Sequence, residues 1–301
     1  MIDELDRQIA WTLAINCRTS LQDLSNKLGI TRTAIKKRID RLVESGAIAA
    51  FSVRFNLAQV DHDVAFAILS FEEPPHDEYL VNYLSDSPFI SEISRTFDKR
   101  VIIIFEYPSP TELSHLTNSF RTMEGVTNVE LWTNLVVDKG GKIELTGIHK
   151  KVLRSLIKDA KMSISDIAKE TGLTPRRISK TIGELIESRA ILFTISWVAN
   201  LAGETTFVSK IYYDASKIEP REFLKMIYPK VTDKFNYAHI SGTEPFIIFA
   251  FTVDHFTEAD KVQKEIMDTG LATSIDSMLT YPGIKPKHPR VSALERFLED
   301  S

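Results

Sequence analysis

The residues best suited to chemistry form a basic run from Lys27 to Arg41. This run holds six Lys or Arg residues and one acid, Asp40, within a chain whose net charge is −4. Neutralising DNA phosphates requires such a patch, and Arg or Lys near a helix N-terminus can reach guanine edges. A solvated helix face often carries lysine too, but the concentration of charge on one helix favours DNA. The residues expected to contact DNA are Arg32, Thr33, Lys36, Lys37 and Arg41.

Other kinds of chemistry find little support. The sequence has no glycine-rich phosphate loop, no GxSxG elbow and no HExxH motif, and its seven histidines lack metal-ligand spacing. We therefore expect no metal, no cofactor and no enzymatic activity. The single cysteine, Cys17, fits a reducing cytoplasm. The apolar runs are too short for a membrane helix, and the acidic N-terminus lacks a secretory pattern, so no membrane partner is expected.

The basic run needs a helix to present it, and the sequence predicts one. Helical apolar spacing predicts a first helix over residues 3–16, Ser20 caps a second, and Thr31 caps a third over Arg32–Ser45. The alternating segment Phe51–Phe55 then predicts a wing. Three helices with a short turn before the third make a helix-turn-helix, whose third helix fits the major groove.

The sequence repeats at a spacing of 143 residues. Leu5 to Ile48 falls on Ile148 to Ile191 without a gap. Turn residues, caps and core positions match together, which two unrelated amphipathic helix sets would not do. The polar, glycine-rich segment 138–147 is the natural hinge between the two copies.

The second copy carries a weaker basic face. Thr181 stands where the first copy has Arg38, and Glu184 stands where it has Arg41. Two interpretations stay open: this module contacts DNA mainly through the phosphate backbone, or it only docks. The residues expected to be exposed on its third helix are Arg176, Arg177, Lys180 and Thr181. Supporting DNA contacts are expected from Arg176, Arg177 and Lys180.

After each wing the pattern changes to the order β-α-β-β-α-β, the split βαβ plan. Predicted strands cover 64–71, 89–97, 100–107 and 126–137, then 205–213, 235–241, 246–253 and 272–281. Predicted helices cover 77–85, 110–121, 220–228 and 257–268. The open face of each sheet must be covered, and a twofold or pseudo-twofold partner sheet is the simplest cover.

The predicted fold class is α+β, with two copies of a winged helix-turn-helix plus a ferredoxin-like βαββαβ domain. The predicted helix-turn-helix domains are 1–60 and 139–203. The predicted ferredoxin-like sensing domains are 61–138 and 204–284, and a C-terminal tail covers 285–301.

Short motifs of the first copy resemble those of one known family. They are Leu5-Asp6, Leu24 to Thr33, Arg38 to Leu42, Gly46 to Ile48, and Met123 to Val126 with Val129. These motifs are similar to those of the Lrp/AsnC (leucine-responsive, feast/famine) regulators. The resemblance covers nearly all of residues 1–282, although the second copy drifts in motif.

The resemblance implies a transcription regulator that binds double-stranded DNA, assembles into homo-oligomers and responds to an amino acid or similar effector. In this family the effector site lies near the turn between the second and third strands of the sensing domain. Ordinary turn residues without a ligand explain the sequence equally well. The candidate effector residues are Asp98, Arg100, Gly242 and Glu244. Whether the two halves pair within one chain or between chains stays open.

Two alternatives to a site-specific regulator also stay open. Sirohaem decarboxylases resemble this family in fold and occur as paired or fused halves. His239 and Arg95 could supply the histidine and arginine that such enzymes use, but the basic third helix argues against this. The other alternative is an architectural chromatin protein without promoter specificity.

Overall fold

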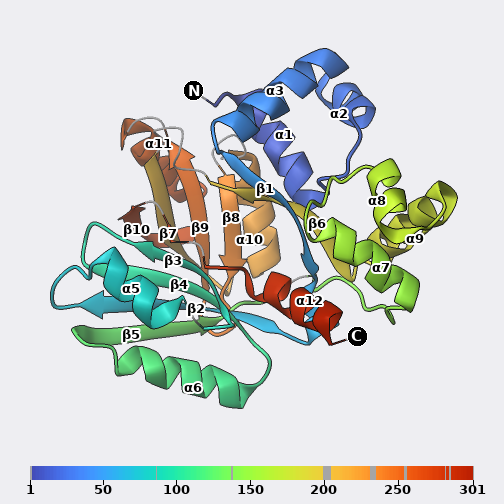
Figure 1. Ribbon diagram of the computed structural model, residues 1–301. Helices are drawn as coiled ribbons and strands as arrows, with labels where there is room; N and C mark the ends of the chain where they lie inside the picture. The colour runs from blue at the N-terminus through green and yellow to red at the C-terminus, as the bar shows by residue number, and fades with distance from the viewer. Residues whose placement is uncertain are drawn as a thin grey trace. The chain divides into compact units, whose positions relative to one another are not determined.

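The two helix-turn-helix modules lie together in one unit of the structure, and the two sheet domains lie together in another. The computed structural model describes residues 2–85, 87–136, 138–198, 205–230, 235–253, 256–281, 283–284 and 286–300. One compact unit contains Met1–Asp61, Asp138–Ala202 and Arg290–Ser301, and the other contains His62–Val137 and Gly203–Pro289. We call them the helix-turn-helix unit and the sheet unit. Figure 1 shows their elements along the chain.

The helix-turn-helix unit contains both predicted modules. The first consists of α1 (Glu4–Ile15), α2 (Leu21–Leu28), α3 (Arg32–Glu44) and β1 (Ile48–Phe55), followed by the short α4 (Leu57–Val60). The second consists of α7 (Gly147–Leu156), α8 (Ile164–Thr171), α9 (Pro175–Glu187) and β6 (Ile191–Trp197). Thr31 and Thr174 cap α3 and α9 through their side chains, as the sequence predicts.

The two wings join the modules by pairing with each other. β1 and β6 are antiparallel, with Phe51 opposite Ile195 and Ser52 opposite Thr194. On the 143-residue repeat, Phe51 corresponds to Thr194 and Ser52 to Ile195, so the repeat exchanges these two pairs. The modules are therefore related by a pseudo-twofold axis through the paired wings.

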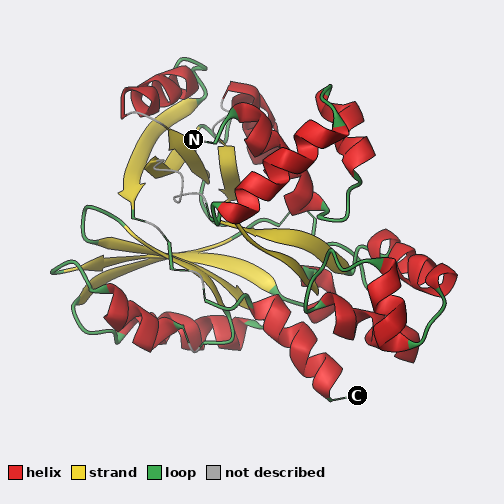
Figure 2. Ribbon diagram, turned by 45° about the horizontal axis from the view of Figure 1, so that its top comes forward, coloured by secondary structure: helices red, strands yellow, loops and turns green. Residues whose placement is uncertain are grey.

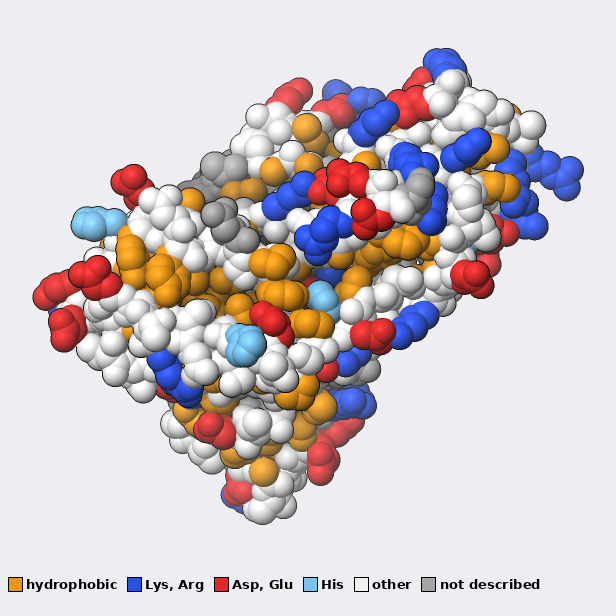
Figure 3. Space-filling view, turned by 60° about the horizontal axis from the view of Figure 1, so that its bottom comes forward, with side chains coloured by type: hydrophobic (Ala, Val, Ile, Leu, Met, Phe, Trp, Pro, Cys, Tyr) orange, Lys and Arg blue, Asp and Glu red, His pale blue; other side chains and the backbone are white. Residues whose placement is uncertain are grey.

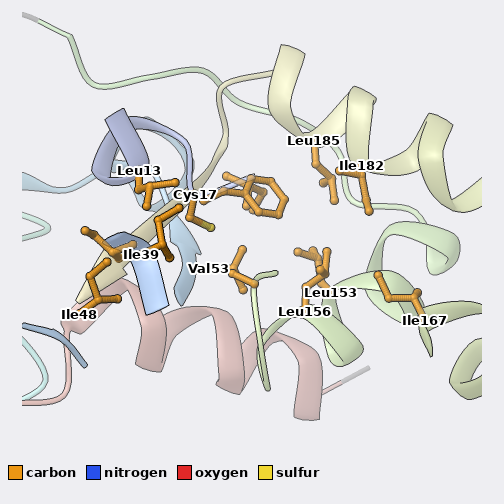
Figure 4. Packing of buried hydrophobic residues seen from close by; sticks show 14 of the residues in the cluster. Leu13, Cys17, Ile39, Ile48, Val53, Leu153, Leu156, Ile167, Ile182 and Leu185 are labelled. Carbon is orange, nitrogen blue, oxygen red and sulfur yellow. The ribbon is translucent and has the colours of Figure 1, made fainter. Parts of the chain in front are cut away.

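One hydrophobic core serves both modules. Leu13 and Ile39 of the first module and Leu153 and Ile182 of the second belong to the same buried cluster (Figure 4). Helix α12 (Pro289–Glu299) lies in the segment predicted as a C-terminal tail. It adds two buried leucines to this cluster, Leu294 and Leu298. Burying a leucine side chain contributes roughly 1.5–3 kcal/mol, so α12 is a structural part of this unit.

The sheet unit contains two βαββαβ domains, as predicted. The first has β2 (Asp63–Phe71), α5 (Asp77–Leu84), β3 (Ile90–Arg95), β4 (Arg100–Tyr107), α6 (Pro110–Arg121) and β5 (Val126–Thr133). The second has β7 (Thr205–Tyr213), α10 (Pro220–Ile227), a 3-10 turn (Tyr228–Lys230), β8 (Phe235–Ile240), β9 (Phe246–Val253), α11 (Phe256–Met267) and β10 (Ala272–Thr280). The strand orders, β3-β4-β2-β5 and β10-β7-β9-β8, are equivalent. In the first domain α5 and α6 cover one face of the sheet (Figure 2).

The two sheets pair within one chain. Thr96 directly after β3 bridges to Thr280 of β10, and Asn134 after β5 bridges to Ser241 after β8. Phe66 on β2 lies 4.2 Å from His239 on β8, measured between ring centroids. Each sheet therefore covers the other, which answers the question that the sequence left open.

Some predictions need correction or lie outside the described residues. Thr181 was expected to be exposed, but it is fully buried because this position of α9 faces the shared core side of the module. The strand predicted over 126–137 ends at Thr133, and residue 137 lies outside the described residues. The predicted borders at 203–204 and 285 also lie outside them, and the domain division stays a prediction. Across the described residues no helix is long and apolar enough to span a membrane.

Candidate nucleic-acid interface

Helix α3 turns its apolar side to the core and its basic side outward. Ile35, Ile39 and Leu42 are buried, which fixes the orientation of the helix about its axis. All five predicted contact residues of this helix are exposed: Arg32, Thr33, Lys36, Lys37 and Arg41. A major groove can therefore approach them without rearrangement of the core.

The positive charges of α3 differ in how they are paired. Lys36 Nζ lies 2.6 Å from Asp40, an exposed pair that contributes little to stability and leaves the lysine available to phosphate. Arg41 donates a hydrogen bond to Asp6, whose side chain is completely buried. For Arg32 and Lys37 the described residues supply no ion-pair partner. These two residues are the cations of α3 that can most readily contact DNA.

Arg38 of α3 is partly buried and stabilises the module through ion pairs. Its guanidinium contacts Asp3 at 2.6 Å and Asp6 at 2.9 Å, and its side chain is only 23% exposed. Hydrogen bonds to these two carboxylates raise the pKa of Arg38. Arg38 therefore ties α3 to the start of α1 and helps to hold the basic face in place.

Helix α9 presents a weaker basic face. Arg176 and Lys180 are exposed, and Lys180 Nζ lies 3.7 Å from Glu184. Arg177 is half-buried, and its Nε is a buried donor with no hydrogen-bond partner within the described residues. Arg176 and Lys180 are thus the cations of α9 that lie at the surface.

Further basic residues of the second module lie on α7 and in the turn that follows it. Lys151, Arg154 and Lys158 line an open groove of about 630 Å³ with Ser155, Glu170 and Thr171. Lys158 Nζ lies 3.0 Å from Glu170, and Arg154 donates to the Leu298 carbonyl oxygen at 2.7 Å. Figure 3 shows one face of the molecule, where Lys and Arg side chains lie beside Asp and Glu. On this face the basic side chains are therefore interspersed with acidic ones.

The four candidate effector residues lie in two corresponding turns of the sheet unit. Arg100 Nη1 lies 2.7 Å from Asp276 on β10, and Arg100 also donates to Asp98. Burial alone would lower the pKa of Arg100, but hydrogen bonds to Asp276 and Asp98 raise it. Two carboxylates of the chain itself therefore already neutralise the cation that was expected to bind a ligand's carboxylate.

The second turn is also anchored on the other copy. Glu244 accepts a hydrogen bond of 3.0 Å from Trp132 Nε1 on β5. A Cβ added to Gly242 would lie 3.1 Å from Thr133 Oγ1 and 3.4 Å from its carbonyl oxygen, so close packing favours glycine there. Asp276 and Trp132 were not singled out in the sequence, because their roles depend on a strand from the other copy.

His239 and Arg95 have different surroundings. His239 lies between the sheets, where Asn134 is 3.1 Å from its Nδ1, and burial lowers its pKa to about 3. Arg95 instead pairs with Asp77 at the start of α5 at 2.5 Å and stacks on Tyr281 at 4.7 Å. His239 and Arg95 therefore have different polar partners, Asn134 for the histidine and Asp77 for the arginine.

Comparisons with known proteins agree with this architecture. Residues 2–43 match an AsnC-type helix-turn-helix domain, and residues 145–191 match a winged helix-turn-helix DNA-binding domain. The HTH-type transcriptional regulator LrpA of Pyrococcus horikoshii is 27% identical over 132 residues, 43% of this chain and 93% of that protein. An uncharacterized HTH-type transcriptional regulator of Pyrococcus abyssi is 37% identical over 73 residues, 24% of this chain and 49% of that protein.

Solved structures of a siroheme decarboxylase are similar over nearly the whole chain. The siroheme decarboxylase NirDL is 14% identical with a TM-score of 0.59, covering 99% of this chain and 98% of its own. At this identity the likeness shows the fold alone. The chain thus carries an AsnC-type helix-turn-helix domain, has Lrp/AsnC-type regulators among its relatives, and contains a tandem duplication.

Proposed function

We propose that this chain is a sequence-specific transcription regulator that inserts α3 into the major groove of double-stranded DNA. The observation that carries the proposal is the exposed cationic face of α3 in a chain of net charge −4. Its sequence relatives are transcription regulators, which supports the proposal. Arg32 and Lys37 are expected to read bases or phosphates most directly, with Thr33, Lys36 and Arg41 beside them.

The second module is proposed to contribute phosphate contacts. Arg176, Arg177 and Lys180 on α9 would hold the DNA backbone rather than read bases, because two of these three cations are partly buried or paired with a carboxylate. Such contacts add affinity but no sequence preference. This division predicts an asymmetric operator with one well-defined half.

The double substitution Lys36→Glu and Lys37→Glu tests the proposal. We expect DNA affinity to fall at least about 100-fold near 100 mM salt, measured by fluorescence anisotropy on a duplex selected from genomic fragments. The matched control is Lys217→Glu with Lys225→Glu, two exposed lysines of the sheet unit with side chains 61% and 72% exposed. Unchanged affinity of the α3 variant at low salt, with the fold intact, would show that the surface is wrongly assigned. Footprinting would separate a site-specific regulator from an architectural protein.

The proposal extends to partners and location. We infer that a cytoplasmic homo-oligomer forms, and that an amino-acid effector acts near Asp98, Arg100, Gly242 and Glu244. An effector at Arg100 would have to displace Asp98 or Asp276, which predicts weak binding. Isothermal titration with a panel of amino acids measures this binding, and size-exclusion chromatography with light scattering measures the oligomeric state.

A siroheme decarboxylase is the second candidate, because His239 lies buried between two sheets in a chain with that overall fold. Against this candidate, Arg95 is occupied by Asp77 and Tyr281. Titration of the purified chain with an iron tetrapyrrole tests it. A saturable Soret shift that the His239→Ala variant loses would favour the enzyme over the regulator.

A further inference from the structure

The sheet unit contains a buried lysine that is enclosed by three aromatic rings. Lys210 lies on β7 and is only 5% exposed. Its Nζ lies 3.9 Å from the ring centroid of Trp132, 4.6 Å from that of Phe246 and 5.2 Å from that of Tyr212. We call these three rings the aromatic cage. We propose that the aromatic cage is an ammonium-binding site, filled in this chain by its own Lys210.

The surroundings of Nζ match the chemistry of an ammonium ion. A buried charge is costly unless partners replace its water shell. Glu130 on β5 accepts a hydrogen bond from Nζ at 3.2 Å, which uses one of the three N–H donors. The negative faces of the rings stabilise the remaining positive charge. One carboxylate and three ring faces form a compact site that suits an ammonium better than a planar guanidinium.

The cage is held together by contacts that do not involve Lys210. Trp132 donates its indole N–H to Glu244 at 3.0 Å. The rings of Trp132 and Phe246 meet edge to face at 5.1 Å, and those of Tyr212 and Phe246 lie 5.5 Å apart. These contacts join β5 of the first copy to β7, β9 and the β8–β9 turn of the second. The site is therefore built independently of the side chain that fills it.

The first copy shows that the fold does not require this arrangement. Ile68, the sixth residue of β2, stands where β7 has Lys210 as its sixth residue. The inter-sheet cation of the first copy is Arg100 on β4, and two carboxylates rather than rings surround it. The corresponding part of the first copy thus packs between the two sheets without an ammonium group enclosed by rings. This difference points to a specific role for the cage.

Because Lys210 occupies the aromatic cage, the cage also has a consequence for regulation by small molecules. An amine from solution finds the cage next to Glu244 already filled by Lys210. The cage therefore narrows the proposed effector region: an external effector is expected to act at Asp98 and Arg100 of the first copy rather than at Gly242 and Glu244. This regulatory consequence rests on the proposed function, whereas the occupancy of the cage does not. The test below therefore contains no DNA, and its failure leaves the α3 experiment unaffected.

Replacing Lys210 and restoring its missing atoms from solution tests the proposal. Lys210→Ala removes three carbons and the ammonium group, which propylammonium matches atom for atom. We expect propylammonium chloride to raise the thermal midpoint of the full-length variant by about 3 °C over sodium chloride of equal ionic strength. Neutral 1-propanol should not do so. The wild-type chain and Lys225→Ala, which truncates an exposed lysine, should show no selective rise.

Two further measurements keep the proposal falsifiable if Lys210→Ala does not fold. Lys210→Met keeps the cage filled and should not respond to propylammonium. In the NMR spectrum of the wild-type chain, ring currents should shift the lysine ε-methylene protons of Lys210 upfield, and Lys210→Met should remove that signal. An equal response to propanol and propylammonium, or loss of only an unshifted signal in Lys210→Met, would overturn the proposal.

Discussion

The two helix-turn-helix modules share a core, but the acidic and basic residues that link their first and third helices exchange places. In the first, the buried carboxylate of Asp6 on α1 binds Arg38 and Arg41 of α3. In the second, His149 replaces Asp6 and Glu184 replaces Arg41, and His149 Nε2 lies 3.2 Å from Glu184. The contact between the first and third helices is thus kept while its polarity is exchanged. Packing restricts the apolar positions, whereas a polar pair needs only complementary partners.

This exchange goes together with a different distribution of basic residues over the first and third helices of the two modules. Helix α3 keeps five Lys or Arg residues, whereas α9 has three and gains Glu184. Helix α7 has two lysines and an arginine and no acid, whereas α1 has one arginine and two acids. The first module is therefore suited to reading the major groove, and the second carries its charge on another face.

The largest expected effect concerns His239, which stands in β8 where β3 has Ser94. Burial lowers the pKa of His239 to about 3, against about 6.5 in an unfolded chain. Between these pH values the unfolded state binds a proton that the folded state does not. Stability present above about pH 6.5 is therefore lost as the pH falls, by up to about 1.4 kcal/mol per unit. Urea unfolding between about pH 6 and pH 4 should show a steeper loss in the wild-type chain than in His239→Phe. Equal slopes would contradict this.

The next prediction compares how much the polar contacts of Asp6 and of His149 contribute to the free energy of unfolding. Asp6→Ala should lower the free energy of unfolding by about 2 kcal/mol, because two guanidinium groups lose a carboxylate that is completely buried. His149→Ala, at the corresponding position, should cost only about 1 kcal/mol, because its partner Glu184 is 35% exposed. Denaturant unfolding of both variants measures the difference. A larger loss in His149→Ala would reverse the comparison.

A third prediction separates the two third helices on DNA. Arg32→Ala with Lys37→Ala should weaken binding about tenfold and reduce the salt dependence by about two released ions. Arg176→Ala with Lys180→Ala should weaken binding about threefold without changing sequence preference. Anisotropy titrations at several salt concentrations, on specific and scrambled duplexes, measure both quantities. Equal losses for the two pairs would mean that the modules bind DNA alike.

The smallest expected effect comes from giving the second module the acid and base arrangement of the first, by substituting His149 and Glu184. Glu184→Arg alone places a guanidinium beside His149, and His149→Asp alone places a carboxylate beside Glu184. Each single variant should be less stable, and the double variant should recover about 1 kcal/mol relative to additivity. A double-mutant cycle by urea unfolding measures the coupling. Additive losses would show that the two positions do not form an exchangeable pair.

Much of the local structure follows from neighbouring residues. Helix α3 was predicted over Arg32–Ser45 and spans Arg32–Glu44, and β4 was predicted over 100–107 and spans Arg100–Tyr107. Caps, glycines and apolar periodicity act within a few residues, so they can be read from the chain directly. The exposed basic residues of α3 were found in the same way, because the period of the helix defines its outer face.

Contacts between distant segments could not be read in this way. Arg41 is predicted to contact DNA, but its ion pair with Asp6 does not follow from the sequence. Thr181 was expected to be exposed, yet it is buried. For Arg41 the deciding neighbour, Asp6, lies on another helix, 35 residues away in the sequence. The cage around Lys210 is a stronger example, since its rings come from three strands in two copies.

The order of elements, the duplication and the cationic character of α3 are properties of the linear chain, since each depends on spacing or composition over short stretches. The pairing of the two sheets with each other, the packing of α12 and the partners of the buried charges arose only on folding. Apolar faces need cover but do not specify which cover, and charges need counterparts but do not specify which ones. The assembled core makes that choice, by bringing together residues of both copies.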